Sequence, residues 1–324
     1  MGLTVATAPF SPGPYEVGTF RTPRFDSFTA SVWYPYGNQT QTAPPNPKGL
    51  LPLLVFVSGF LQQEGEYNEL LQSVASHGVV VVGLGWKYTS VIGLNYTHLA
   101  QRLDGVFAYG RSKEIDHDLM QQKPRPLGLP DARAVLLGAH SIGNHIIVRR
   151  LTSFGCAGVG GVVMIDPVDG ADPYGFIKQF VIHPPAPVNF VTPAIHIETG
   201  LDPRRSSWLT PPCAPLAMSN DRFFHAWRGP IWQLNATGFG HNDVSDHALK
   251  SHATCPGSAN SSALVLYRLT VAGAITAFVR GLFGVETLPE AAAVLNGTVA
   301  APVAIEYAER GPTTQPLRLS CTAP

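Results

Sequence analysis

Short apolar runs alternate with helical patterns along most of this chain, and this alternation constrains the fold more than any other feature. The runs LLPLLVFV at 50–57 and VVVVGLG at 79–85 have the length and composition of strands buried on both faces. Between them, the segment 67–78 carries its leucines and a valine on one helical face and ends at a glycine. Similar strand-like runs occupy 29–34, 134–138, 161–166, 194–199 and 231–237, and a second helical pattern occupies 144–153. This order predicts an α/β protein with a mostly parallel, doubly wound sheet and helices on both faces.

Long, proline-rich segments at 170–193 and 201–230 are expected to be loops. In a doubly wound sheet, such loops gather over the carboxyl ends of the strands, where ligands bind. We expect a single domain over 1–324, with its core at about 10–285 and a C-terminal extension at 286–324.

Composition disfavours several classes of function. Lys plus Arg and Asp plus Glu number 22 each, so no overall field attracts nucleic acid. The four cysteines show no Cys-X-X-Cys spacing, which disfavours a zinc site. The chemistry expected below therefore uses neither a metal nor a cofactor.

Two segments bear on membrane insertion and targeting. The apolar run 263–283 contains Arg268 and Arg280, so a helix packed on the sheet is expected in place of a membrane span. The first residues, MGLTVATAPF, have neither a basic nor an apolar stretch, so no signal peptide is expected.

The stretch AVLLGAHSIGNHIIV at 134–148 joins a predicted strand directly to a predicted helix through a tight turn. Ser141 lies at the centre of that turn, with the small residues Ala139 and Gly143 two positions before and after it. This is the nucleophile-elbow pattern Gly-X-Ser-X-Gly, with alanine in place of the first glycine. Ser141 is therefore the predicted nucleophile.

A serine hydroxyl needs a base to take its proton, and the base follows the last strands in this arrangement. His241, in the GFGHND segment after the strand at 231–237, is the predicted base. His247 is the alternative, although it is expected to begin the next helix. His140 and His145 flank the serine, and a structural role is expected for them in place of proton transfer.

The base in turn needs a carboxylate that orients it. Asp166, at the end of the strand at 161–166, is the predicted acid. Asp169, in the same turn, and Asp202, after the following strand, remain alternatives.

Ester cleavage builds negative charge on the carbonyl oxygen, and backbone N–H groups commonly bind it. The N–H of Ile142, just after the nucleophile, is expected to be one donor. The second is expected from Phe60, in the SGFLQQ turn after the strand at 50–57, where Gly59 allows close approach.

Four segments of the chain resemble the chlorophyllases. The stretch LLVFVSGFLQQEGEYNELLQSVASHGVVVVG is similar to the one in which their strand leads to a His-Gly-Phe turn and a helix ends in Ala-Ser-His-Gly. LLGAHSIGNH, MIDPVDG and GFGHND are similar to their serine, aspartate and histidine motifs, in the same order over about 10–285. The departures are Ser58 in place of a histidine, Ala139 and Asn144 in place of glycines, and Ile142 in place of an arginine, which suggests a divergent, algal-type member.

The resemblance implies an α/β-hydrolase fold with Ser141, Asp166 and His241 as its catalytic triad. It implies hydrolysis of chlorophyll, the small-molecule substrate, to chlorophyllide and phytol, in a chloroplast. Because a phytylated substrate lies in thylakoid lipid, peripheral contact of the protein with that membrane is expected. A lipase- or phospholipase-like esterase with the same triad is the alternative function. A non-catalytic pigment- or lipid-binding protein is the third.

A porphyrin ester with an isoprenoid tail needs a wide apolar surface near the serine. The side chains expected to contact it are Leu61, His140, Trp208, Phe224 and Phe239. Ordinary core packing is the alternative for the aromatic ones. Cys213 and Cys255 flank the segment that carries His241, and a disulfide between them would restrain it and make activity depend on redox state.

Overall fold

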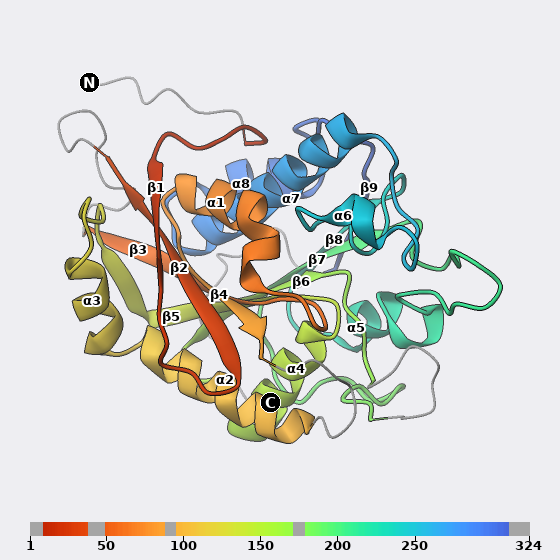
Figure 1. The fold of residues 1–324 in the computed structure, drawn as a ribbon, viewed down its shortest axis with the longest axis horizontal. Coiled ribbons are helices and arrows are strands. Elements are labelled where there is room, and N and C mark those ends of the chain that lie inside the picture. Colours follow the sequence, from red (N-terminus) through yellow and green to blue (C-terminus); the bar gives the residue numbers. More distant parts are fainter. Residues whose placement is uncertain (1–8, 38–48, 88–94, 171–178, 311–324) are drawn as a thin grey trace.

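A single nine-stranded sheet runs through the structure, which is a computed structural model describing residues 9–37, 49–87, 95–170 and 179–310. Its strand order is β1-β2-β4-β3-β5-β6-β7-β8-β9 (Figure 1). The strands are β1 (Glu16–Arg21), β2 (Phe28–Tyr36), β3 (Leu50–Val57), β4 (Val80–Trp86), β5 (Leu129–His140), β6 (Val159–Ile165), β7 (Ala194–Thr199), β8 (Ile231–Ala236) and β9 (Glu306–Arg310).

The six central strands β4, β3, β5, β6, β7 and β8 are parallel, and antiparallel pairs close the sheet at both ends. The predicted mostly parallel sheet is therefore confirmed. All seven predicted strands are present, with ends shifted by a few residues in most cases. The edge strands β1 and β9 escaped prediction because both are short and largely polar or partly exposed, and they lack the continuous apolar run of a buried strand.

Helices cover both faces of the sheet, as predicted. Helices α1, α7 and α8 lie on one face, and α2, α3 and α4 on the other (Figure 1). The helices are α1 (Asn68–Ser76), α2 (Tyr96–Gly110), α3 (Lys113–Met120), α4 (Gly143–Phe154), α5 (Asp221–Ala226), α6 (Ala248–Ser251), α7 (Ser261–Leu282) and α8 (Leu288–Leu295). Helices α2 and α3 were not predicted, although Leu99, Leu103 and Phe107 recur at helical spacing in α2 and Ile115 and Leu119 do so in α3.

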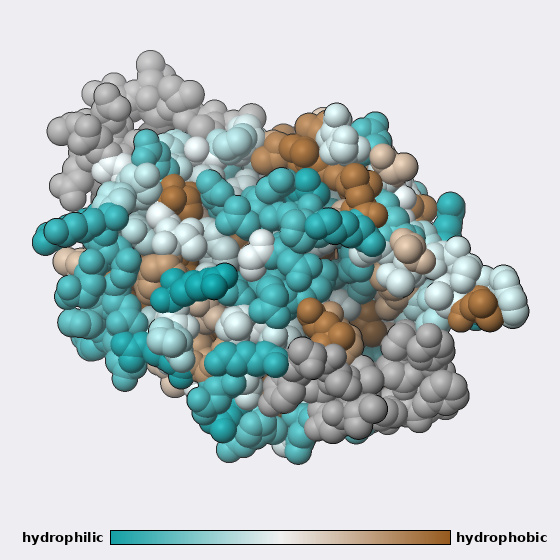
Figure 2. All heavy atoms as spheres, viewed as in Figure 1, coloured by the Kyte–Doolittle hydropathy of each residue, from teal (hydrophilic) through white to brown (hydrophobic). Residues whose placement is uncertain are grey.

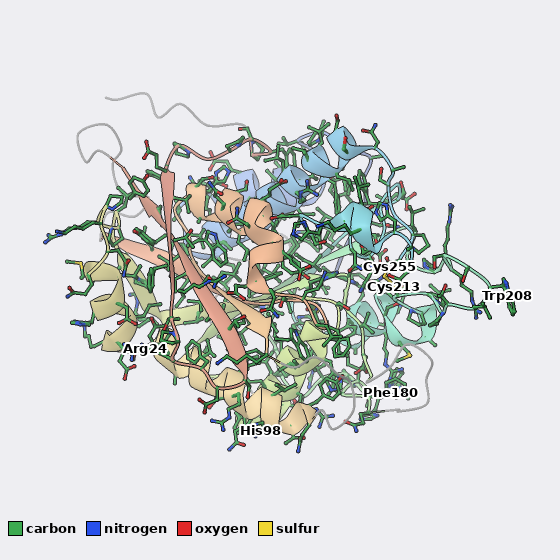
Figure 3. The ribbon with its side chains drawn as sticks, viewed as in Figure 1. Arg24, His98, Phe180, Trp208, Cys213 and Cys255 are labelled. Carbon is green, nitrogen blue, oxygen red and sulfur yellow. A yellow bond between two sulfur atoms is a disulfide. The ribbon has the colours of Figure 1, made fainter. Side chains whose placement is uncertain are left out.

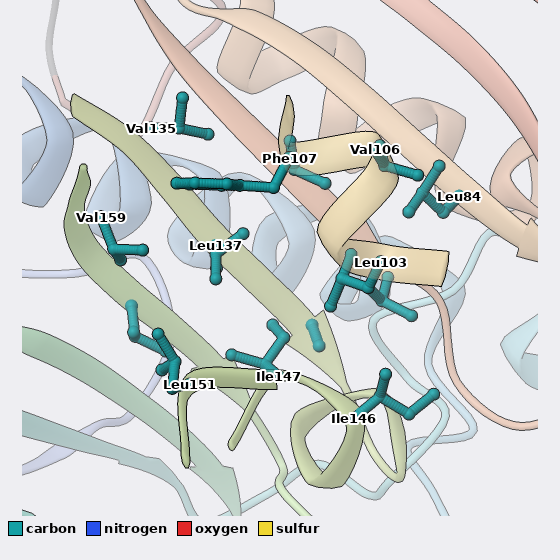
Figure 4. Packing of buried hydrophobic residues seen from close by; sticks show 14 of the residues in the cluster. Leu84, Leu103, Val106, Phe107, Val135, Leu137, Ile146, Ile147, Leu151 and Val159 are labelled. Carbon is teal, nitrogen blue, oxygen red and sulfur yellow. The ribbon is translucent and has the colours of Figure 1, made fainter. Parts of the chain in front are cut away.

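The core consists of two apolar layers, one on each side of the sheet. Strand β3 supplies both: Leu53, Val55 and Val57 face the α2–α4 side, while Leu54 and Phe56 face the α1–α7 side. Figure 4 shows the first layer, in which Leu103 and Phe107 of α2 and Ile147 of α4 meet the side chains of β5 and β6. This burial fixes the carboxyl ends of the strands, from which the site is built.

Helix α7 has the length and apolar character of a membrane span, alone among the helices that the structure describes. Within its most apolar window 72% of the helix is buried, as expected for a core helix. Beyond it, β9 pairs with β8, so residues after 285 add a strand to the same sheet.

Candidate active site

Ser141 lies in a strained turn between β5 and α4. Its φ is +55°, in the left-handed region that side chains other than glycine rarely adopt. A Cβ on Gly143 would lie 2.9 Å from the Val57 carbonyl oxygen and 3.0 Å from the Ala139 Cβ. Helix α4 can therefore begin this close to the strands only because position 143 is glycine.

Three buried side chains form a hydrogen-bonded chain at this turn. His241 Nε2 is 2.8 Å from Ser141 Oγ, and His241 Nδ1 is 2.8 Å from Asp166 Oδ2. These residues come from the ends of β5, β8 and β6, whose parallel order brings their following loops to one edge of the sheet. The arrangement lets the imidazole accept the serine proton at Nε2 while the carboxylate accepts the hydrogen bond from Nδ1.

The Asp166 carboxylate is held from several sides. Its backbone has a φ of +45°, and its side chain accepts hydrogen bonds from the Thr199 N–H and hydroxyl, at 3.0 and 2.9 Å. The Asn220 amide donates to it as well, at 3.3 Å. Thr199 ends strand β7, which neighbours β6, so the sheet itself orients the acid.

Asp202 lies beside this pair, with an Oδ2 atom 3.7 Å from His241 Nδ1. It shares the Thr199 hydroxyl and the Asn220 amide with Asp166. Burial, and then the Asp202 charge, raise the pKa of Asp166 well above its ordinary value, and burial raises the pKa of Asp202 to about 6. Each of these buried carboxylates therefore disfavours the charged form of the other. Asp202 is thus a second acid within reach of the same imidazole.

Asp169 and His247 lie away from the serine. Asp169 is buried on the α4 side, where it accepts hydrogen bonds from His145 Nδ1 and Arg222 Nε, both at 2.9 Å. Although burial alone would raise it, hydrogen bonds from His145 and two backbone N–H groups lower the pKa of Asp169. His247 is exposed at the start of α6. Neither Asp169 nor His247 therefore belongs to the hydrogen-bonded series of Ser141, His241 and Asp166.

A second buried hydrogen-bond network holds the backbone of His241. His140 Nε2 lies 2.8 Å from the His241 carbonyl oxygen, so it carries the proton, and His140 Nδ1 accepts from the Tyr67 hydroxyl at 2.6 Å. Burial, and then the neighbouring His241, hold the pKa of His140 well below its ordinary value and keep it neutral. The Tyr67 hydroxyl also accepts from the Gly59 N–H at 2.9 Å. The network thereby joins the loop after β3, the serine turn and the histidine loop.

The two expected oxyanion donors are available. Phe60 and Ile142 line the same cavity as Ser141, and no acceptor for either N–H lies within the described part of the chain. Gly59 permits this geometry, since a Cβ there would lie 2.6 Å from His140 Nδ1.

Ser141 and His241 open onto a cavity of about 370 Å³ with mostly apolar walls. Its lining also includes Phe60, Tyr96 and Val168. A larger hollow of about 780 Å³ lies beside α2, and neither Ser141, His241 nor Asp166 lines it. The cavity beside Ser141 is therefore the candidate binding site.

None of the side chains expected to contact substrate is among those that line this cavity. His140 and Phe239 are buried: His140 supports His241, and the Phe239 ring stacks on Tyr267 at 4.4 Å. Both are core residues, so the expectation does not fit them. Phe224 packs near His196, and Leu61 and Trp208 are exposed on loops. Of the residues predicted for the site, Ser141 and His241 line the cavity and the five expected substrate contacts do not.

One wall of the cavity contains a disulfide between Cys213 and Cys255 (Figure 3). This pairing was a hypothesis from the sequence, and the structure contains it. It ties the loop before α5 to the segment after α6, close to Asn242, whose amide donates to Cys255 Sγ.

Asp166, Asp202 and His241 place possible metal-ligand atoms within 4.8 Å of one another. A zinc ion between His241 Nδ1 and Asp166 Oδ2 would hold them about 4 Å apart at most, because each ligand lies about 2 Å from the metal, and about 3.3 Å apart in tetrahedral geometry. They are 2.8 Å apart, which is a hydrogen-bond separation. The cluster fits a proton and does not fit a metal.

Comparisons with known proteins agree with the resemblance to the chlorophyllases. The sequence model of the chlorophyllase family matches residues 6–311. Chlorophyllase-2 of Arabidopsis thaliana is 27% identical over 224 residues, which cover 65% of this chain and 66% of that protein. Chlorophyllase-1 of Arabidopsis thaliana is 23% identical over 263 residues, covering 74% of this chain and 73% of that protein. The chain therefore belongs to the chlorophyllase family.

Proposed function

We propose that this chain is a serine carboxylic-ester hydrolase that cleaves the phytyl ester of chlorophyll to chlorophyllide and phytol. Family membership supports the ester hydrolase, and the motifs of the chlorophyllases support the substrate. The observation that carries the proposal is the hydrogen-bonded series Ser141, His241 and Asp166 at an apolar cavity.

In the first half of the proposed reaction, Ser141 Oγ attacks the carbonyl carbon of the propionate ester while His241 Nε2 takes its proton. The bond between that carbon and the phytyl oxygen then breaks, and His241 returns the proton to the leaving oxygen. Phytol departs and the acyl group stays on Ser141. In the second half, water replaces phytol: it loses a proton to His241, attacks the acyl carbon, and Ser141 leaves with the proton as chlorophyllide forms.

Asp166 would keep the His241 proton on Nδ1 and stabilise the imidazolium that forms in each half-reaction. The N–H groups of Phe60 and Ile142 would bind the oxyanion, with a contribution of about 3 to 4 kcal/mol for each donor. No step requires a metal or a cofactor.

The cavity is small for a tetrapyrrole with an isoprenoid tail. At about 370 Å³ it suits the ester group and its nearest neighbours, so most of the pigment would lie against the surrounding loops. A chlorophyll-bearing membrane of the chloroplast is the setting that the family suggests for such a substrate.

The test is conversion of chlorophyll a in detergent, followed by chromatography, with the wild-type protein and Ser141→Ala. The proposal expects chlorophyllide from the wild type and a loss of about 10⁶-fold in the variant. If the wild type cleaves p-nitrophenyl esters but not chlorophyll, the chain is a lipase-like esterase on another substrate. If it cleaves neither, a binding protein on this scaffold is the remaining interpretation.

A further inference from the structure

The three most exposed large apolar side chains in the described part of the chain all belong to the loop between β7 and α5. They are Trp208 at 83%, Leu216 at 69% and Leu209 at 68% of full exposure. Figure 3 shows Trp208 at the end of this loop, projecting away from the body of the molecule, with Cys213 and Cys255 at its base. Exposing two neighbouring large apolar side chains, Trp208 and Leu209, to water is unfavourable, and such a patch commonly marks a binding surface.

Local hydrogen bonds hold the loop tip in shape. The Thr210 N–H donates to the Ser207 carbonyl oxygen at 3.4 Å, which closes a turn with Trp208 and Leu209 as its two central residues. The Thr210 hydroxyl accepts from the Ser207 N–H at 3.1 Å and bonds Ser206 Oγ at 2.8 Å. The turn thus presents both apolar side chains outward without packing them on the domain.

Positive charge lies next to this apolar tip. Arg204 and Arg205 are exposed, and no ion pair joins either to another residue of the described segments. The loop contains no carboxylate between Asp202, which is buried in the site, and Asp221 at the start of α5. The positive charge of Arg204 and Arg205 is therefore local to this loop, because the whole chain has no net charge.

The loop also forms part of the candidate site. Cys213, five residues after Trp208, lines the cavity that Ser141 and His241 share, and its disulfide to Cys255 anchors the loop there. Figure 2 shows the same loop as an isolated projection that carries an apolar side chain at its end. Whatever binds the tip is therefore brought next to the mouth of the cavity.

We propose that the loop 203–210 docks this protein on a lipid bilayer with anionic headgroups. Trp208 and Leu209 insert at the boundary between headgroups and acyl chains, and Arg204 and Arg205 contact the headgroup phosphates. This inference rests on the proposed function, because docking matters for a substrate whose isoprenoid tail lies in the bilayer. It adds the surface through which the site meets that substrate.

Vesicle flotation tests the docking without turnover if every protein carries Ser141→Ala. Binding is measured to vesicles of phosphatidylcholine with phosphatidylglycerol and to phosphatidylcholine alone. Removing the tip with Trp208→Ser and Leu209→Ser should lower the partition coefficient about tenfold or more on both vesicles. Removing both charges with Arg204→Ser and Arg205→Ser should lower it about fivefold for each arginine on the anionic vesicles only.

The matched control is Val265→Ser with Leu266→Ser, an adjacent and partly exposed apolar pair on α7. It should leave the partition coefficient unchanged. The proposal is overturned if the tip variant floats like its parent, or if the control loses binding equally. It is also overturned if the parent is a dimer without lipid and the tip variant a monomer, because the tip then binds a second copy.

Failure of the docking and failure of the proposed function give different results. Hydrolysis of a soluble p-nitrophenyl ester needs Ser141 but no bilayer, so the tip variant in an otherwise wild-type protein should retain it. Loss of docking with retained esterase activity removes only the loop's role, whereas loss of esterase activity in the wild-type protein removes the function itself.

Discussion

Replacing each of the two acids beside His241 by asparagine should have very different effects on ester hydrolysis. Asp166 and Asp202 are both buried, and they lie 2.8 and 3.7 Å from His241 Nδ1. The two variants Asp166→Asn and Asp202→Asn are matched in size and in charge removed. They differ in which carboxylate is left to face the imidazolium.

The distances set the magnitude. Asp202→Asn leaves in place the Asp166 carboxylate that hydrogen-bonds His241 Nδ1, so kcat/KM should fall less than about fivefold. In Asp166→Asn the charge must lie on Asp202. At an effective dielectric constant of about 20, moving it from 2.8 to 3.7 Å weakens the attraction from about 6 to about 4.5 kcal/mol. Loss of the short charge-assisted hydrogen bond adds about 1.5 kcal/mol, so the total is about 3 kcal/mol, or about 100-fold.

The double variant retains no carboxylate, and its loss should reach about 10⁴-fold, as for a triad without its acid. The assay is the hydrolysis of a soluble p-nitrophenyl ester near pH 8, with circular dichroism to verify folding. The reasoning is refuted if Asp166→Asn is as slow as the double variant, because Asp202 then carries nothing. It is equally refuted if Asp202→Asn is the slower of the two single variants.

Three further predictions concern stability. Gly143→Ala places a Cβ against the Val57 carbonyl, so we expect a loss of about 1 to 3 kcal/mol in denaturant unfolding; an unchanged midpoint would contradict the close packing of the elbow. Burial raises the pKa of Asp202 to about 6, so the folded protein keeps a proton there that the unfolded chain loses near pH 4, and stability falls as pH rises from about 4 through about 6. Asp202→Asn should therefore raise the free energy of unfolding by about 3 kcal/mol near pH 8 and by nothing near pH 4, in unfolding curves at both values. Replacing Cys213 and Cys255 by serine opens a loop of 42 residues and should cost about 4 kcal/mol, whereas a melting curve insensitive to the change would show that the link adds no stability.

The strands, and the turns in which Ser141 and His241 lie, could be predicted from the sequence because local pattern determines them. The run at 50–57 is apolar throughout, since β3 is buried on both faces, and its predicted bounds equal the observed ones. Ser141 and His241 follow apolar strands in tight turns, and turn residues are visible in sequence. The hydrogen bonds between these groups depend on the sheet order, which no local pattern contains.

The residues around the triad were harder to predict. Thr199 supports Asp166 only because β7 neighbours β6, and Tyr67 reaches His140 from a position 73 residues earlier in the chain. The aromatic residues that were expected to contact substrate do not line the cavity, for a related reason. Phe239 is apolar and close to His241 in sequence, but composition cannot tell whether a ring faces the core or the cavity.

We propose above that Ser141, polarised by His241, is the nucleophile. The most direct measurement is intact-mass and peptide mapping after reaction with a fluorophosphonate, which phosphonylates only activated serines. We expect one adduct on the wild-type protein, located on Ser141. It should be absent from Ser141→Ala and form far more slowly in His241→Ala. No adduct on the folded wild-type protein, or an adduct on another serine, would contradict it.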